Sequence, residues 1–228
     1  MKIELQKRII TSIFLISLVS LCLYLGGLAI VIALFIVSYI TYSEFSGLLD
    51  ITYKYSASQH LLRHGMIIFY CFFIFFLSSL ALTINNVYDF IFVISICIFS
   101  DVGGYIVGKI IKGPKLTKIS PNKTISGTIG SFIFSTFPLV IFSQIDIELY
   151  SLNYKNLIFC LLVSLVSQAG DLFVSFLKRK AKIKDTGKIV YGHGGILDRM
   201  DGIIFAVPFV CIYLHGFEHI NFFDYFFK

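Results

Sequence analysis

Two acidic residues, Asp101 and Asp171, interrupt runs of sequence that are otherwise apolar. A carboxylate at the depth of a bilayer core costs about 2.5–3.5 kcal/mol, so it is rarely retained without a partner or a water-filled cavity. The two residues therefore indicate a polar site within apolar helices. The competing interpretation is structural, with each carboxylate satisfied in the packing by a neighbouring Ser or Lys.

The densest group of reactive residue types lies between residues 175 and 201. Its lysines alone would suit a cationic loop that binds anionic lipid head groups, but glycines around His193 and two aspartates follow them. Glycines let the backbone approach a ligand closely, so that N–H groups can face phosphate oxygens. Asp198 and Asp201, at i and i+3 at the start of a helix, share one face. Such carboxylates suit Mg²⁺, which bridges carboxylates and substrate phosphates.

A third candidate is the segment Ser120-Pro121-Asn122-Lys123-Thr124, directly before an expected helix. Hydroxyl groups, a lysine and a helix N-terminus can together hold a phosphate group. The same residues also form an ordinary helix start, so the segment gains its meaning from its position beside the other two candidates.

The elements that must position these residues are transmembrane helices. The chain of 228 residues is 57% apolar and only 14% charged, whereas soluble domains are about 25% charged. We predict an all-α, polytopic integral membrane helix bundle with about seven transmembrane helices and a single domain over 1–228, with N-terminal hairpins in 1–100 and a catalytic portion in 101–202. The expected helices span residues 9–25, 28–46, 66–82, 87–111, 127–142, 157–177 and 202–217.

The cations predict the orientation of this bundle. With the N-terminus in the cytoplasm, 17 of the 19 Lys and Arg residues fall on one side of the membrane, as the positive-inside rule requires. The formal charge of +6 is then explained by cytoplasmic loops, without a nucleic-acid partner. The three candidate segments would converge on one cavity that faces the cytoplasm.

These residues resemble the phosphatidate cytidylyltransferases, also called CDP-diacylglycerol synthases. The match covers Ser175-x-x-Lys178-Arg179, Lys184-Asp185, Gly192-His193-Gly194-Gly195 and Asp198-Arg199-x-Asp201. Upstream it covers Asp101-x-x-Gly104-Tyr105-x-x-Gly108, Ser120-Pro121-x-Lys123-Thr124 and Gln168-x-Gly170-Asp171. The sequence departs from the usual family pattern at Asn122, Ser126, Ser131 and Tyr191.

The resemblance implies a reaction of CTP with phosphatidate that gives CDP-diacylglycerol and pyrophosphate, in phospholipid biosynthesis at a bacterial inner membrane. It implies Mg²⁺ at Asp171, Asp198 and Asp201, leaves a second cation open, and is compatible with a homodimer among membrane lipids. The other residues expected to be catalytic are Lys178, Arg179, Lys184, Asp185 and His193. Those expected to bind substrate are Ser120, Lys123, Thr124, Ser175, Gly194, Gly195, Arg199 and Asp101. Asp101 is expected to hold a lysine in place, and Arg199 either binds substrate or pairs with Asp185 or Asp201.

Three alternatives compete with this interpretation. A CTP-dependent polyprenol or phytol kinase shares part of the pattern but would release CDP. A CDP-alcohol phosphotransferase is rejected, because Phe205-Ala206 follows Asp198-x-x-Asp201-Gly202 where that family has Ala-Arg. A transporter or channel with Asp101 and Asp171 in its ion path, or a lipid-binding scaffold, is the non-enzymatic alternative. Transport would favour polar residues through the full depth of the membrane, whereas the first three expected helices carry no ionisable residue in their interiors apart from Glu44 near an end.

Overall fold

The computed structural model describes residues 15, 17–52, 57–85, 87–117, 119–145, 150–187 and 194–217. Within these ranges the regular structure is helical, and an isolated antiparallel bridge joins Lys115 to Thr124. The predicted all-α class is therefore confirmed for this part of the chain.

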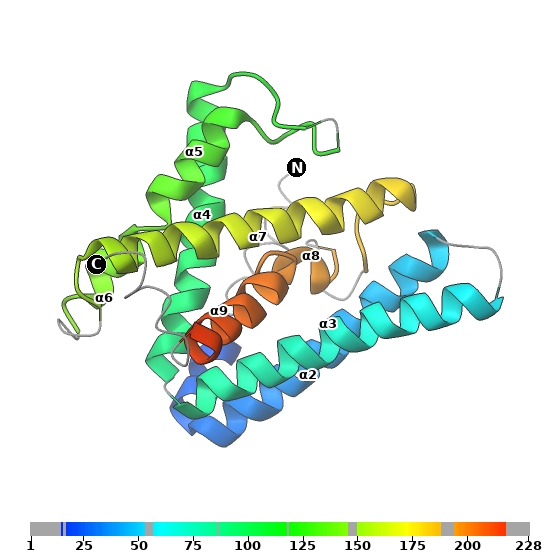
Figure 1. The fold of residues 1–228 in the computed structure, drawn as a ribbon, viewed down its shortest axis with the longest axis horizontal. Helices are drawn as coiled ribbons and strands as arrows, with labels where there is room; N and C mark the ends of the chain where they lie inside the picture. Colours follow the sequence, from blue (N-terminus) through cyan, green and yellow to red (C-terminus); the bar gives the residue numbers. More distant parts are fainter. Residues whose placement is uncertain are drawn as a thin grey trace. The chain divides into compact units, whose positions relative to one another are not determined.

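Eight helices have named bounds in the described ranges, and residues 17–25 are also helical ahead of Gly26. The named helices are α2 (Gly27–Thr52), α3 (Ala57–Asn85), α4 (Val87–Ile111), α5 (Ile125–Phe134), α6 (Phe137–Phe142), α7 (Tyr154–Lys180), α8 (Leu197–Met200) and α9 (Ile203–Phe217) (Figure 1).

Helix α4 has the expected bounds, and α7 and α9 agree with the expected helices within three residues at each end. Helix α2 ends six residues later than expected, at Thr52, and α3 begins nine residues earlier, at Ala57. The expected helix over 127–142 is divided in two, because Pro138 at the start of α6 has no N–H with which to continue the hydrogen bonding of α5. The hydroxyls of Ser135 and Thr136 donate to backbone carbonyls at the break. Residues 9–14 and 16 of the first expected helix lie outside the described residues.

Among the described residues, five segments are long and apolar enough to cross a membrane: Gly27–Thr52, Arg63–Ile84, Val87–Ile111, Ile125–Phe142 and Tyr154–Lys180. A shorter apolar segment follows at Ile203–Leu214. Large apolar side chains such as Leu28, Phe69 and Ile110 are exposed on these helices, as expected for side chains that meet lipid. These apolar helices and their exposed apolar side chains indicate an integral membrane protein.

The structure divides into two compact units, each with its own buried residues. The first comprises residues 1–87 and 173–201, and the second comprises 88–172 and 202–228. In the first unit α3 and α8 both pack against α2, and Leu48 and Phe75 are almost completely buried. In the second, Ile96 and Val163 are fully buried. Helix α7 contributes residues to both units.

Candidate active-site residues

Helices α4 and α5 lie side by side in the second unit (Figure 1) because small residues line their contact. A Cβ on Gly127 would lie 2.8 Å from the carbonyl oxygen of Gly104, and one on Gly108 would lie 2.9 Å from Thr124 Oγ1. These distances are too short for a real side chain, so the two backbones are in direct contact. The glycines of α4 thus serve a helix contact within one chain.

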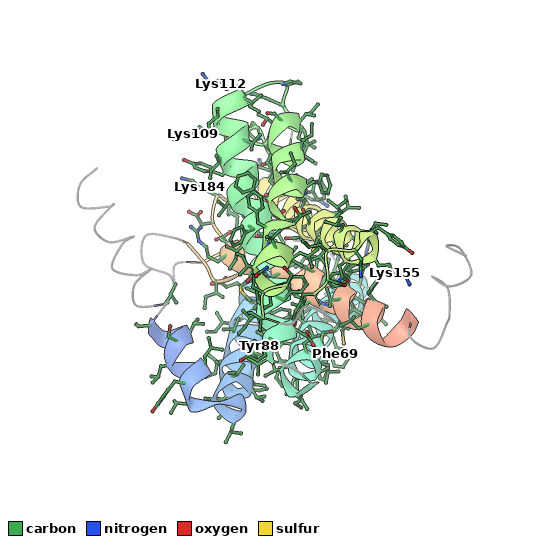
Figure 2. All side chains as sticks on the ribbon, turned by 90° about the vertical axis from the view of Figure 1, so that its left-hand side faces the viewer. Phe69, Tyr88, Lys109, Lys112, Lys155 and Lys184 are labelled. Atoms are coloured by element: carbon green, nitrogen blue, oxygen red, sulfur yellow. The ribbon has the colours of Figure 1, made fainter. Side chains whose placement is uncertain are left out.

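The segment between these helices is folded back on itself rather than extended. Its two ends are joined by hydrogen bonds from Leu116 N to the Lys123 carbonyl (2.9 Å) and from Ile125 N to the Pro114 carbonyl (3.0 Å). The amide of Lys123 donates to the Ser120 carbonyl at 3.1 Å, closing a turn that contains Pro121. Figure 2 shows Lys109 and Lys112 near this end of α4, whereas Tyr88 lies at the other end.

Thr124 ends this segment and is the N-cap of α5. Its hydroxyl oxygen accepts a hydrogen bond from the amide of Gly127 at 3.1 Å, which satisfies one of the backbone N–H groups that a helix start leaves unpaired. The sequence predicted a helix start here, and the structure assigns the capping role to Thr124.

A cavity of about 330 Å³ opens beside this helix start and lies wholly within the second unit. Five residues proposed from the sequence as site residues line it from three different parts of the chain. They are Asp101 on α4, Ser120, Lys123 and Thr124 before α5, and Asp171 on α7. The sequence did not single out Thr128 as part of a site, and this residue lines the cavity as well. Gln168, Tyr105, Asn122 and Ser131, which the sequence analysis named only within motifs or as departures from them, complete its polar wall.

An ion pair between Lys123 Nζ and Asp171 Oδ2 lies at this cavity. The side chains of both residues are a little over one quarter exposed, so they are accessible from the cavity. Asp101 lines the same cavity, and its expected role of holding a lysine stays a prediction, because the ion pair found here joins Lys123 to Asp171. Since Lys123 comes from the loop and Asp171 from α7, the pair also ties the loop to that helix.

Asp198 and Lys178 form a second cluster, in the first unit. Lys178 Nζ donates to Asp198 Oδ1 at 2.8 Å, and the two side chains are only 13% and 8% exposed. Asp198 Oδ2 accepts hydrogen bonds from the amides of Thr186 (2.8 Å) and Gly195 (3.0 Å). Lys178, expected to contact phosphate, is therefore engaged with a carboxylate in this structure.

The surroundings of Asp198 keep its carboxyl group ionised. Burial would raise the pKa of Asp198, but the hydrogen bonds from Lys178, Gly195 and Thr186 outweigh this effect and hold the pKa below its usual value. Each of these donors favours the charged form. Asp198 is thus a permanent negative charge at neutral pH.

Two glycines allow the backbone to close around this cluster. Gly194 has a φ of +89°, a conformation that side-chain-bearing residues rarely adopt. A Cβ on Gly194 would also lie 2.8 Å from Asp198 Oδ2. A Cβ on Gly195 would collide with the carboxylate of Glu44. The predicted role of these glycines, close approach of the backbone, is observed here toward protein carboxylates.

Glu44 is the residue of this cluster that the sequence analysis did not propose. It lies on α2, is 8% exposed, and accepts hydrogen bonds from Thr186, Ile196 and Leu197. Its only signal in the sequence is a position near the end of an apolar run. A carboxylate there can equally face water, so the sequence does not mark Glu44 as part of a site.

The remaining expected residues have simpler positions. Ser175 is half-buried on α7, Arg179 is exposed in the last turn of that helix, and Lys184 and Asp185 are exposed after it. Arg199 is exposed on α8 and Asp201 is half-buried at its end. His193 lies outside the described residues.

The carboxylates of both units are the donor type that a hard cation requires. Within the described ranges, no group of three or more His, Cys, Asp or Glu residues is arranged to hold a metal ion. Asp101 and Asp171 line the cavity of the second unit, and Asp198 and Asp201 belong to the first. Because Mg²⁺ is usually held by one or two carboxylates together with substrate phosphates, these oxygen donors fit that ion.

The fold and these residues define an integral membrane protein with a polar cavity among apolar helices. The chain belongs to the cytidylyltransferase family, because a model described as "Cytidylyltransferase family" matches residues 48–217. The resemblance drawn from the motifs is confirmed by this match.

Curated relatives agree with the family. The chain is 43% identical over 120 residues to a protein of Rickettsia felis named phosphatidate cytidylyltransferase, covering 49% of this chain and 53% of that protein. A Helicobacter pylori protein of the same name is 38% identical over 117 residues, covering 51% and 43%. One from Rickettsia bellii is 38% identical over 150 residues, covering 62% of each. The chain spans about half the length of the curated relatives that it matches.

Proposed function

We propose that this chain is a phosphatidate cytidylyltransferase that converts CTP and phosphatidate into CDP-diacylglycerol and pyrophosphate. The observation that carries the proposal is the polar cavity of the second unit, in a chain that belongs to the cytidylyltransferase family. Its wall combines a lysine, hydroxyl groups and the start of α5, and backbone N–H groups at a helix start favour phosphate. The relatives carry the name of this activity.

The reaction needs no activated Ser or Cys nucleophile. The phosphate of phosphatidate is already an anion near neutral pH, and one of its oxygens attacks the α-phosphorus of CTP. The bond from that phosphorus to the bridging oxygen breaks, and pyrophosphate leaves with the electron pair. The barrier comes mainly from bringing two anions together in line, so alignment and charge neutralisation are the protein's contributions.

Lys123 is proposed to neutralise phosphate charge at the cavity. Its ion pair with Asp171 holds the ammonium group at the cavity wall before substrate binds, so less side-chain entropy is lost on binding. Thr124 fixes the start of α5 through its cap, which orients the neighbouring backbone N–H groups. Ser120 supplies a further hydroxyl at the same wall.

Magnesium is proposed as the cofactor, with Asp171 as a ligand in the second unit and Asp198 and Asp201 as ligands in the first. The oxygen donors described above support this choice. When bound, the ion neutralises charge on the triphosphate and on the departing pyrophosphate. The low pKa of Asp198 means that its carboxylate needs no deprotonation to serve as a ligand near neutral pH.

The remaining proposals concern topology and assembly. We propose seven spans with the N-terminus and the site in the cytoplasm of a bacterium, in its inner membrane, which places the site where CTP is available. The distribution of cations supports this orientation. A homodimer is part of the proposal, and mass photometry in detergent would separate it from a monomer.

The activity is tested with purified chain in detergent micelles containing phosphatidate, CTP and Mg²⁺. Mass spectrometry should detect CDP-diacylglycerol, and EDTA should abolish its formation. Replacing phosphatidate by phytol or a polyprenol tests the kinase alternative. Formation of a phosphorylated alcohol, with no CDP-diacylglycerol from phosphatidate, would contradict the proposal.

A further inference from the structure

Glu44 binds backbone that lies far along the chain from it. One carboxylate oxygen, Oε1, accepts a hydrogen bond from the amide of Ile196 at 3.2 Å. The other, Oε2, accepts from the amide of Leu197 at 2.8 Å and from the Thr186 hydroxyl at 3.2 Å. Both carboxylate oxygens are therefore occupied by protein donors, and the side chain is 8% exposed. All four residues belong to the first unit.

The same two stretches of backbone are also held by Asp198. Thr186 donates its amide to Asp198 and its hydroxyl to Glu44. The amide of Gly195 donates to Asp198, and the next two amides donate to Glu44. Asp198 and Glu44, the latter on α2, thus both bind the backbone or side chains of two short stretches, Thr186 and residues 195–197, which are called the held segments below.

The backbone packs tightly against the Glu44 carboxylate. A Cβ on Gly187 or on Gly195 would collide with its carboxylate. The backbone therefore closes directly on the carboxylate oxygens. Gln at position 44 would keep one acceptor oxygen but would place an NH2 donor where the second carboxylate oxygen accepts, so at least one of the amides of Ile196 and Leu197 would lose its acceptor, which buried backbone donors rarely tolerate.

We propose that Glu44 is a positioning residue for the reaction, which acts by keeping the held segments, Thr186 and residues 195–197, in place so that Asp198 stays against Lys178. The proposal rests on the proposed cytidylyltransferase function. It extends the functional residues to α2, outside the motif-bearing part of the chain. Glu44 itself is not proposed to contact substrate; its described partners are Thr186, Ile196 and Leu197.

The kinetic test compares Glu44→Gln and Glu44→Asp with a control. Asp50→Asn removes one negative charge from the same helix at an exposed position and should leave activity unchanged. Glu44→Gln should lower kcat for CDP-diacylglycerol formation about tenfold to a hundredfold, because hydrogen bonds to a charged acceptor are lost. KM for CTP should change by less than about threefold. Glu44→Asp keeps the charge on a shorter side chain, so it should recover part of kcat.

A second readout does not depend on catalysis. Lys182 and Lys184 are exposed a few residues before Thr186. Limited trypsin digestion followed by mass spectrometry measures the rate of cleavage after each of these lysines. Glu44→Gln should be cleaved there at least about tenfold faster than Asp50→Asn, since local opening is what exposes a site to protease. Thr186→Val removes only the hydroxyl bond and should shift cleavage in the same direction by less, which keeps the test usable should Glu44→Gln not fold.

The kinetic and proteolytic readouts distinguish failure of the proposed function from failure of the proposed role of Glu44. If the wild-type chain makes no CDP-diacylglycerol, the proposed function fails, and the cleavage rates still decide whether Glu44 keeps the held segments in place. A wild-type kcat for Glu44→Gln in an active preparation would overturn the proposal. Equal cleavage rates for Glu44→Gln and Asp50→Asn would overturn it as well.

Discussion

Replacing Lys178 by Met should destabilise the protein more than any substitution of an exposed lysine. At the observed separation of 2.8 Å and an effective dielectric constant of about 20, the Coulomb attraction between Lys178 and Asp198 is about 6 kcal/mol. Desolvation of both groups offsets much of this gain. Lys178→Met keeps most of the side-chain volume but leaves the Asp198 carboxylate, 8% exposed, with only its two amide donors. We expect a loss of about 2–4 kcal/mol in unfolding free energy.

The assay is equilibrium or thermal unfolding in detergent, followed by circular dichroism, with Lys184→Met as the matched control. Lys184 is exposed, so its substitution should change stability by less than about 0.5 kcal/mol. The double variant Lys178→Met with Asp198→Asn should recover part of the loss, because it removes the charge that Lys178→Met leaves unpaired. Equal stability of Lys178→Met and Lys184→Met would refute the reasoning that this pair is a buried, stabilising interaction.

Three further predictions concern the cavity, the helix contact and the topology. Asp171→Asn should lower Mg²⁺-dependent formation of CDP-diacylglycerol by about 10²-fold or more in an assay of folded protein in membranes, because the cavity loses an essential charge; near-normal turnover would exclude Asp171 as a metal ligand. Gly130→Ala should lower the unfolding free energy by about 1–3 kcal/mol in thermal unfolding, since its Cβ would overlap Val107 on α4. The control Gly47→Ala, whose Cβ would meet nothing within 4 Å, should leave the unfolding free energy unchanged. Equal effects of the two substitutions would contradict the close α4–α5 contact. In a cysteine-free background, a cysteine at position 184 should react with a membrane-impermeant maleimide only after the cell is opened, and one at position 155 should react from outside; labelling of position 184 in intact cells would overturn the proposed orientation.

The helices of this protein could largely be predicted from the sequence, because a lipid environment permits few other backbone conformations. Lipid forces the backbone into continuous hydrogen-bonded segments, so runs of apolar residues gave nearly the observed bounds, as at α4. The break before α6 was missed although Pro138 marked it, because two polar residues, Ser135 and Thr136, are too short an interruption to end an apolar run.

The gathering of polar groups was partly predictable. Carboxylates within apolar runs are costly, and Asp101 and Asp171 both line the cavity that the loop residue Lys123 also lines. The partner of Lys123 was not predictable, because choosing between two aspartates depends on side-chain distances that no spacing in the sequence encodes. Glu44 was missed for the same reason: its hydrogen-bond partners begin 142 residues further along the chain.

The central claim is that the α-phosphate of CTP passes to lipid while the β- and γ-phosphates leave together. The most direct measurement gives the purified chain CTP labelled at the α-phosphate in one reaction and at the γ-phosphate in another, with phosphatidate and Mg²⁺. The proposed reaction predicts α-label in the lipid fraction and γ-label in free pyrophosphate, in equal amounts. Transfer of γ-label to lipid with release of CDP would contradict it.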